Sequence, residues 1–360
     1  MRLDRLQLRG FRNLGAFDLP LPAEGMVLLG PNAQGKTNLL EAIGYPVLFR
    51  ALRGAVDTDV AAFGGPGFSL EAAFHDGSRD RTTRVTFTAG NRQKRILLDG
   101  APVTRLSEAA GAWAAVAFLP RDVTLAGGPA AERRHFLDRM LSLASPDYLS
   151  ALARYRAALA QRNAALRQGQ EAMARVFDAP LAVAGSEITA RRQRWAAGAS
   201  ERFAEGFASL GEAGPVGLSY RSDAALADPA GWQDALHRAR TRDLGRRMTT
   251  IGPHRDDLLL TVGGRPLREF GSTGQQRSAA VALRLLELAT LREARGVPPA
   301  LLLDDVFAEL DADRQARLAD RLLSGKVGQV FVTAPREDEL PKGLRLPIWS
   351  VNGGVVRTSR

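Results

Sequence analysis

Alternating and apolar runs along the first 120 residues predict a region rich in β-strands. Apolar and polar residues alternate at 3–8 and again at 16–21, whereas 26–29 is wholly apolar. Leu39, Leu40 and Ile43 then recur at helical spacing and predict a helix that ends near residue 49. Three further runs, 68–74, 84–88 and 95–98, predict antiparallel strands joined by tight turns such as 76–77 and 89–90. Residues 116–119 predict one more strand.

From about residue 121 to residue 250 the pattern becomes helical. Four apolar residues, Leu152, Tyr155, Leu159 and Leu166, repeat at heptad-like spacing, and Arg162 interrupts their seam. Beyond a helix break at 178–180, a second apolar stripe predicts another helix: Ile188, Trp195, Phe203, Phe207 and Leu210. The two helices predict a helical hairpin, here called the arm. Its arginines are expected to form a solvated face, with contact to DNA as the alternative: Arg154, Arg162, Arg167, Arg191, Arg192 and Arg194.

Residues 251–360 return to an α/β pattern. Strands are predicted at 258–262, 300–303 and 327–332, and helices at 275–295 and 314–323. We therefore predict an α/β fold in three segments. A nucleotide-binding lobe with an antiparallel β subdomain (1–120) is interrupted by a helical arm domain (121–250) and is completed by 251–360.

The segment MVLLGPNAQGKTNLL (26–40) has the pattern of a phosphate-binding loop that opens a helix. Gly30 and Gly35 permit a tight turn whose N–H groups point at a polyphosphate, and the helix dipole adds positive potential there. Lys36 is expected to contact the β- and γ-phosphates, and the Thr37 hydroxyl to ligate Mg²⁺. The residues expected to bind ATP are Gly30, Pro31, Asn32, Ala33, Gln34, Gly35, Lys36, Thr37 and Asn38. A chance glycine-rich turn would not explain the order strand, loop, helix.

Two later motifs complete a pattern of ATP chemistry. Residues 301–305 form an apolar run ending in two carboxylates, as in a Walker B strand. Asp304 is expected to hold Mg²⁺ beside Thr37, and Asp305 to orient the attacking water as a general base. Ser272 and Gly274 open the helix predicted at 275–295 and offer a second anion site with free N–H groups. A single nucleotide does not need two γ-phosphate sites in one chain.

The order of these motifs resembles the ABC-type ATPases, whose serine–glycine motif contacts the γ-phosphate held by the opposite subunit. Within that superfamily the chain closely resembles the RecF family of recombination proteins. The motifs that carry this resemblance span nearly the whole chain: 8–13 (LRGFRN), 30–38, 132–138 (ERRHFLD), 252–257 (GPHRDD), 272–277 (STGQQR) and 303–311 (LDDVFAELD).

The resemblance implies an SMC-head-like ATPase without a long coiled coil, which forms an ATP-dependent homodimer on double-stranded DNA. It further implies a preference for junctions between single- and double-stranded DNA, and work with RecR and RecO to direct RecA to gaps. Arg12 would contact the nucleotide phosphates in this scheme, although a charged residue after a strand is more often solvated.

Several residues depart from the transporter-type pattern. Thr333 stands where those ATPases place a switch histidine, and Asp305 replaces the usual glutamate with a side chain one methylene shorter. No glutamine lies near 118–123 to act as a linker glutamine. We therefore expect a slow, DNA-stimulated ATPase that uses hydrolysis as a timer. An ABC transporter subunit is the alternative, and a small-molecule kinase ranks last because it has no use for Ser272 or for residues 309–311.

Composition agrees with a polyanionic partner. The formal net charge is +10, although only four of the 49 basic residues are lysine, a bias that genome composition also produces. The chain has no cysteine, which excludes disulfides and thiol catalysis. Its N-terminus lacks an apolar signal core, and no run reaches membrane-spanning length, so we expect a cytoplasmic protein.

Two further motifs allow more than one interpretation. Arg133 and Arg134 either contact DNA or hold the arm against the ATPase lobe. His254, beside Asp256 and Asp257, belongs either to a metal cluster or to a hydrogen-bonded turn. The turn is favoured because the motif contains a single histidine.

Overall fold

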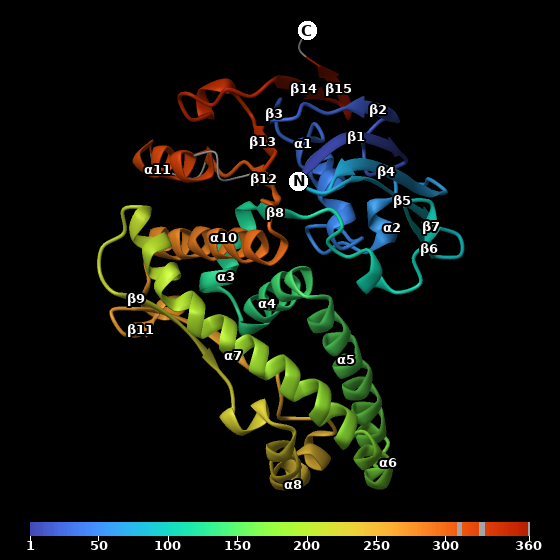
Figure 1. Cartoon of the computed structure of the whole chain (residues 1–360), viewed down its shortest axis with the longest axis vertical. Coiled ribbons are helices and arrows are strands. Elements are labelled where there is room, and N and C mark those ends of the chain that lie inside the picture. The colour runs from blue at the N-terminus through green and yellow to red at the C-terminus, as the bar shows by residue number, and fades with distance from the viewer. Residues whose placement is uncertain (308–311, 324–327, 359–360) are drawn as a thin grey trace. The chain divides into compact units, whose positions relative to one another are not determined.

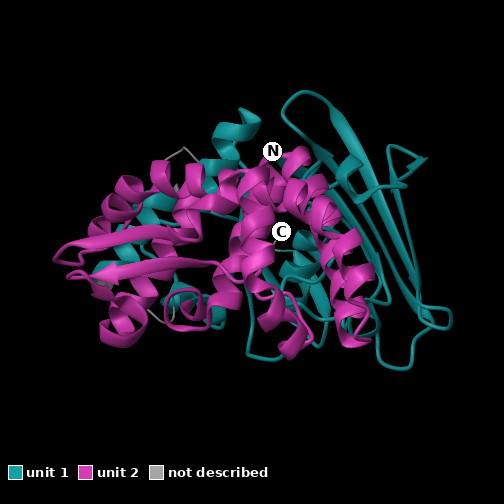
Figure 2. Cartoon of the chain, turned by 90° about the horizontal axis from the view of Figure 1, so that it is seen from below, with its two compact units in different colours: residues 1–122, 287–360 teal, residues 123–286 magenta. Residues whose placement is uncertain are grey.

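The computed structural model describes residues 1–307, 312–323 and 328–358 (Figure 1). The chain divides into two compact units, which Figure 2 colours separately. Unit 1 comprises residues 1–122 and 287–360, and unit 2 comprises residues 123–286. The first junction lies near the expected one at 120–121, whereas the second lies at 286–287 and not at 250–251. No described helix is long and apolar enough to cross a lipid bilayer.

One sheet of unit 1 carries the phosphate loop. Among the described residues it has six strands in the order β15-β14-β3-β13-β12-β8. All its pairings are parallel except that of β15 with β14. The inner strands are buried on both faces, which explains their wholly apolar runs. The strands are β3 (Gly25–Leu29), β8 (Ala115–Phe118), β12 (Ala300–Asp304), β13 (Val330–Ala334), β14 (Ile348–Asn352) and β15 (Val355–Thr358).

The second sheet of unit 1 is antiparallel, with the order β2-β1-β4-β5-β6-β7. Alternate residues of β4 and β5 are buried, because one face packs on the core and the other faces water. Its strands are β1 (Arg2–Arg9), β2 (Phe17–Pro20), β4 (Gly67–His75), β5 (Asp80–Thr88), β6 (Gln93–Leu98) and β7 (Ala101–Pro102). The helices of unit 1 are α1 (Lys36–Gly44), α2 (Asp57–Val60) and α11 (Ala312–Leu323).

Unit 2 contains the predicted helical hairpin. Helices α5 (Pro146–Arg167) and α7 (Asp178–Ser209) pack together and run in opposite directions, with the short α6 (Glu171–Val176) between them (Figure 1). Pro180 lies in the first turn of α7, where its missing N–H has no carbonyl partner to lose. The remaining helices are α3 (Val123–Gly127), α4 (Ala130–Ala144), α8 (Pro229–Arg246), α9 (Leu267–Phe270) and α10 (Thr273–Arg295), which crosses the junction into unit 1.

The expectation of helix throughout 121–250 was wrong for one segment. Residues 216–221 form strand β9 (Val216–Arg221), which pairs antiparallel with β10 (Asp257–Val262). β10 also pairs with the short β11 (Arg265–Pro266), and α7 packs on β9. These contacts hold the segment after residue 250 in unit 2, which explains why unit 2 extends beyond that residue.

The expected solvated face of the arm was wrong for two arginines. Arg162 is 4% exposed, and its guanidinium donates to Asp178 and Asp243 at 2.8 and 2.7 Å. Arg192 is 2% exposed and pairs with Asp138 at 2.6 Å. Buried guanidinium groups need such partners because an isolated buried charge is strongly destabilising. The residues that are exposed, as expected, are Arg154, Arg167 and Arg194.

Candidate nucleotide-binding site

The predicted phosphate loop links β3 to α1 in unit 1. Strand β3 lies between β13 and β14, so its carboxyl end is fixed by hydrogen bonds on both sides. Gly35, directly before α1, has a φ of 109°, and a Cβ there would lie 3.2 Å from the side chain of Asn13. Both the backbone conformation and the available space therefore favour glycine at the entry to the helix.

Lys36 points back into this loop. Its side-chain ammonium donates to the carbonyl oxygens of Gly30 and Pro31 at 2.6 and 3.0 Å, and the residue is 4% exposed. The lysine charge thus lies inside the turn that the sequence assigns to phosphate. The positive end of α1 begins at the same residue, which adds to the local positive potential.

The second motif meets the first across the sheet. The Thr37 hydroxyl donates to Asp304 Oδ1 at 2.8 Å, although the two residues are far apart in sequence. Thr333, at the end of the neighbouring β13, lies 2.9 Å from Asp304 Oδ1 and 3.0 Å from Asp305 Oδ1. Its oxygen also accepts the backbone N–H of Asp305 at 2.9 Å. The Thr333 hydroxyl therefore lies within hydrogen-bond distance of both adjacent carboxylates and can donate its one hydrogen to either of them.

Asp304 and Asp305 differ from ordinary surface carboxylates in their burial or in their backbone conformation. Burial raises the pKa of Asp304 above its ordinary value, and the neighbouring charge of Asp305 acts in the same direction. Asp305 has a φ of 47°, a left-handed conformation that non-glycine residues adopt rarely. Such backbone strain is typical of functional sites. Because Thr37 and Asp304 present only oxygen donors, they fit a hard cation such as Mg²⁺.

Arg12, which the resemblance places on the nucleotide, is already engaged with protein groups. It forms an ion pair with the buried Glu41 at 2.9 Å and donates to the carbonyl of Asp59 at 2.8 Å. Arg53 joins the same carboxylate at 3.0 Å and donates to Asn38, the last residue of the expected nucleotide site, at 2.6 Å. Burial alone would raise the pKa of Glu41, but the two arginines lower it.

The C-terminal hairpin supports the loop, which the sequence did not indicate. The N–H groups of Gly353 and Gly354, between β14 and β15, donate to the side-chain and backbone oxygens of Gln34 at 2.7 and 2.9 Å. The sequence also did not predict the contacts of Arg53 with Glu41 and Asn38, or those of Thr333 with Asp304 and Asp305. The sequence carries no short-range signal for them, because each contact joins segments distant along the chain.

Ser272 and Gly274 belong to unit 2, where Ser272 precedes the N-terminus of α10. The Ser272 hydroxyl accepts the N–H of Gln275 at 3.2 Å, and the Gln275 side chain accepts the N–H of Ser272 at 3.0 Å. This reciprocal pair is a capping box. Ser272 and Thr273 are exposed, so the motif faces solvent in the single chain. Residues 309–311 lie outside the described residues.

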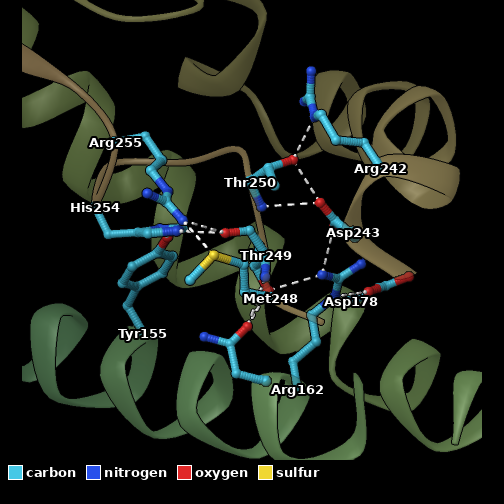
Figure 3. Close-up of polar contacts among 11 residues, drawn as sticks. Tyr155, Arg162, Asp178, Arg242, Asp243, Met248, Thr249, Thr250, His254 and Arg255 are labelled. Atoms are coloured by element: carbon cyan, nitrogen blue, oxygen red, sulfur yellow. Dashed lines mark hydrogen bonds and ion pairs between the residues drawn. The ribbon is translucent and has the colours of Figure 1, made fainter. Parts of the chain in front are cut away.

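The remaining motifs are held inside unit 2. Arg133 of α4 forms a bidentate ion pair with Asp257 of β10 at 2.8 and 2.9 Å. The His254 ring contacts the Tyr155 hydroxyl and the Thr249 carbonyl, as Figure 3 shows. Within the described part of the chain, no cluster of three or more histidine or acidic side chains could hold a metal ion. Both ring nitrogens of His254 make hydrogen bonds within the protein, which agrees with the hydrogen-bonded turn that the sequence favoured.

Known proteins resemble this chain over nearly its whole length. No family model matches the chain. A DNA replication and repair protein RecF from Frankia alni is 36% identical, and the match covers 99% of each chain. The solved structure of a recombination mediator protein, RecF–ATP of the RecFOR pathway, superimposes with a TM-score of 0.88 at 26% identity, covering 100% of this chain and 98% of that one.

A more distant structure defines the fold class. An Smc head domain from Pyrococcus furiosus matches with a TM-score of 0.55 at 16% identity, over 99% of this chain and 96% of that one. The predicted α/β, ABC-type and SMC-head-like ATPase fold is thereby confirmed. Near-complete coverage at this level of identity confirms the predicted resemblance as well: the chain belongs to the RecF family of DNA replication and repair proteins.

Proposed function

We propose that this chain is an ATP-dependent DNA-binding protein of recombinational repair that acts in a RecFOR-type pathway. One observation carries the ATP chemistry: the Thr37 hydroxyl and the Asp304 carboxylate meet at 2.8 Å beside the buried Lys36. Membership of the RecF family and the likeness to a RecF–ATP structure support ATP as the nucleotide.

In this proposal the loop N–H groups and Lys36 bind the phosphates of ATP. Thr37 and Asp304 would hold Mg²⁺, which when bound supplies positive charge against the phosphate oxygens. Asp305, held by Thr333, orients a water molecule and accepts its proton as the water oxygen attacks the γ-phosphorus. The bond from the γ-phosphorus to the bridging oxygen breaks, and ADP and phosphate leave.

The motif at 272–274, in which Ser272 and Thr273 are exposed, is the part of the chain that we propose to drive dimerisation. It would contact the γ-phosphate bound by a second copy, so that ATP drives head-to-tail dimerisation into a clamp on double-stranded DNA. Hydrolysis, slow because Asp305 is shorter than glutamate and stimulated by DNA, would then release the clamp. We expect turnover well below the roughly 10 s⁻¹ of a typical enzyme. Near single-strand gaps, RecO and RecR would work with the clamp to load RecA.

The test compares the wild type with Lys36→Met and Ser272→Arg, each with and without ATP and Mg²⁺. Sedimentation reports dimerisation, and a fluorescent duplex reports DNA binding. We expect the wild type to dimerise and bind DNA only with ATP, and Lys36→Met to do neither. Ser272→Arg should bind nucleotide and remain monomeric. Normal dimerisation of Ser272→Arg would mean that this motif is structural and that the clamp mechanism must be abandoned.

A further inference from the structure

A hollow in unit 2 gathers arginines that the proposed ATP chemistry does not use. It has a volume of about 260 Å³ and lies among α4, α5, α7 and the loop before β10. Its lining includes Arg134, Arg156, Arg192, Asp138, Tyr155 and His254. Arg134 and His254 come from the two motifs whose role the sequence left open.

Positive charge exceeds negative charge in this hollow. Asp138 is the only carboxylate among the residues that line it. Its two oxygens are already shared by Arg192 at 2.6 Å and Arg156 at 3.0 Å, and the Tyr148 hydroxyl donates to it at 2.7 Å. Three guanidinium groups thus face one carboxylate, so the lining carries an uncompensated positive charge.

Arg134 is the least compensated of the three. Among the described residues its guanidinium makes one hydrogen bond, to the carbonyl of Asp256 at 2.8 Å, and no ion pair. Burial, and then the charge of Arg192, lowers the pKa of Arg134 below its ordinary value, although the nearby carboxylates of Asp257 and Asp256 act in the opposite direction. A guanidinium carries five N–H donors. Most of those on Arg134 are therefore available to an anion that enters the hollow.

Two further residues of the lining, Tyr155 and His254, are joined by a hydrogen bond, which Figure 3 shows. The Thr249 carbonyl can only accept, so His254 Nε2 carries the hydrogen and donates at 3.0 Å. His254 Nδ1 then accepts the Tyr155 hydroxyl at 2.5 Å. Burial lowers the pKa of His254 to about 4, so the ring is uncharged at neutral pH. Tyr155 and His254 therefore add no charge to the lining at neutral pH.

We propose that this hollow binds a phosphate group, with Arg134 and Arg156 as its donors. Guanidinium groups match the geometry and charge of phosphate oxygens. The phosphate comes either from the backbone of bound DNA or from a free phosphate compound. A DNA phosphate as the ligand rests on the proposed DNA-binding function, whereas phosphate binding in the hollow does not depend on that function.

The test titrates inorganic phosphate, by calorimetry, into the wild type, Arg134→Gln and Arg156→Gln. Arg154→Gln is the matched control, because Arg154 lies on the same helix α5 but is exposed and pairs with Glu187 at 3.0 Å. All four proteins share an unaltered phosphate loop. We expect a second phosphate site in the wild type and Arg154→Gln, and its loss in the other two. Its absence from the wild type, or its persistence in both hollow variants, would overturn the proposal.

Binding of the same proteins to duplex DNA at fixed salt identifies the source. If the phosphate belongs to DNA, Arg134→Gln and Arg156→Gln should bind duplex about tenfold more weakly than Arg154→Gln. Unchanged DNA affinity together with a lost phosphate site assigns the hollow to a free phosphate compound. If the wild type binds no DNA at all, the proposed function is contradicted. The phosphate titration then still shows whether the hollow binds phosphate. Circular dichroism and urea unfolding like those of the wild type show that the variants fold.

Discussion

At the scale of single residues, Thr333 links the two acidic side chains that the ATP chemistry would use. Its hydroxyl has one hydrogen, which serves Asp304 or Asp305 but not both at once, while its oxygen accepts the Asp305 N–H. From the sequence, Thr333 was notable only because transporter-type ATPases place a histidine at this position. Its role became visible once β12 and β13 were seen to be parallel neighbours.

We predict that Thr333→Val lowers the rate of ATP hydrolysis about tenfold, because the substitution keeps the shape but removes a hydrogen bond to a carboxylate worth roughly 1.5 kcal/mol. ATP affinity should change less than turnover, since Lys36 and the loop are untouched. Single-turnover hydrolysis and nucleotide titration measure the two effects. Thr333→Ser retains the hydroxyl and should hydrolyse nearly normally. Wild-type turnover in Thr333→Val would rule out this role.

Two buried groups of unit 2 should respond to pH in opposite directions. Burial raises the pKa of Asp256 from 3.8 to about 6, so its contribution to stability is lost as pH rises through that value. Burial lowers the pKa of His254 from 6.5 to about 4, so its contribution is lost as pH falls toward 4. Each amounts to about 3 kcal/mol at most.

We therefore predict that Asp256→Asn makes stability rise with pH between about 4 and 6.5, relative to the wild type, and that His254→Gln makes it fall over about the same window. Urea unfolding of the three proteins at closely spaced pH values measures the differences. Parallel pH profiles in all three proteins would show that these two groups do not titrate as stated.

At the scale of elements, the glycines of α7 give a direct test of helix packing. A Cβ at Gly185 would lie 2.2 Å from the ring of the fully buried Trp232 on α8, whereas a Cβ at Gly198 would meet nothing within 4 Å. We predict that Gly185→Ala destabilises the protein by about 1–3 kcal/mol through overpacking. Gly198→Ala should stabilise it by roughly 0.5–1 kcal/mol, because alanine favours helix. Chemical denaturation distinguishes these signs, and equal effects would contradict the packing.

The sequence predicted those elements whose pattern of apolar, polar and glycine residues is strong over a short stretch. The apolar stripes of α5 and α7, the apolar strand β12 and the loop–helix pattern at Lys36 depend on neighbouring residues. β9 and the hairpin of β14 and β15 depend on partner strands, and their own sequences are short and mixed. Arg162 misled the prediction because its charge looks exposed in sequence, while its partner Asp243 lies on another helix.

At the scale of the whole molecule, the net charge of +10 predicts DNA binding that weakens steeply with salt. The logarithm of the affinity should fall linearly with the logarithm of the salt concentration, by about 0.9 per phosphate contact. The chain offers no recognisable base-reading motif, so duplexes of different sequence should bind alike at one salt concentration. Fluorescence anisotropy measures both, and a strong preference for one sequence would contradict a phosphate-dominated interface.

The position of β3 in its sheet has a consequence for biosynthesis. β3 is made early, yet both of its neighbours, β13 and β14, belong to the last part of the chain. At translation rates of about 5–20 residues per second, the strand waits on the order of 15–60 s for these partners. All of unit 2 leaves the ribosome during that interval. The nascent β3 thus lacks both of its partner strands, and the phosphate loop lacks the support of its sheet, until residues 330–352 have been made.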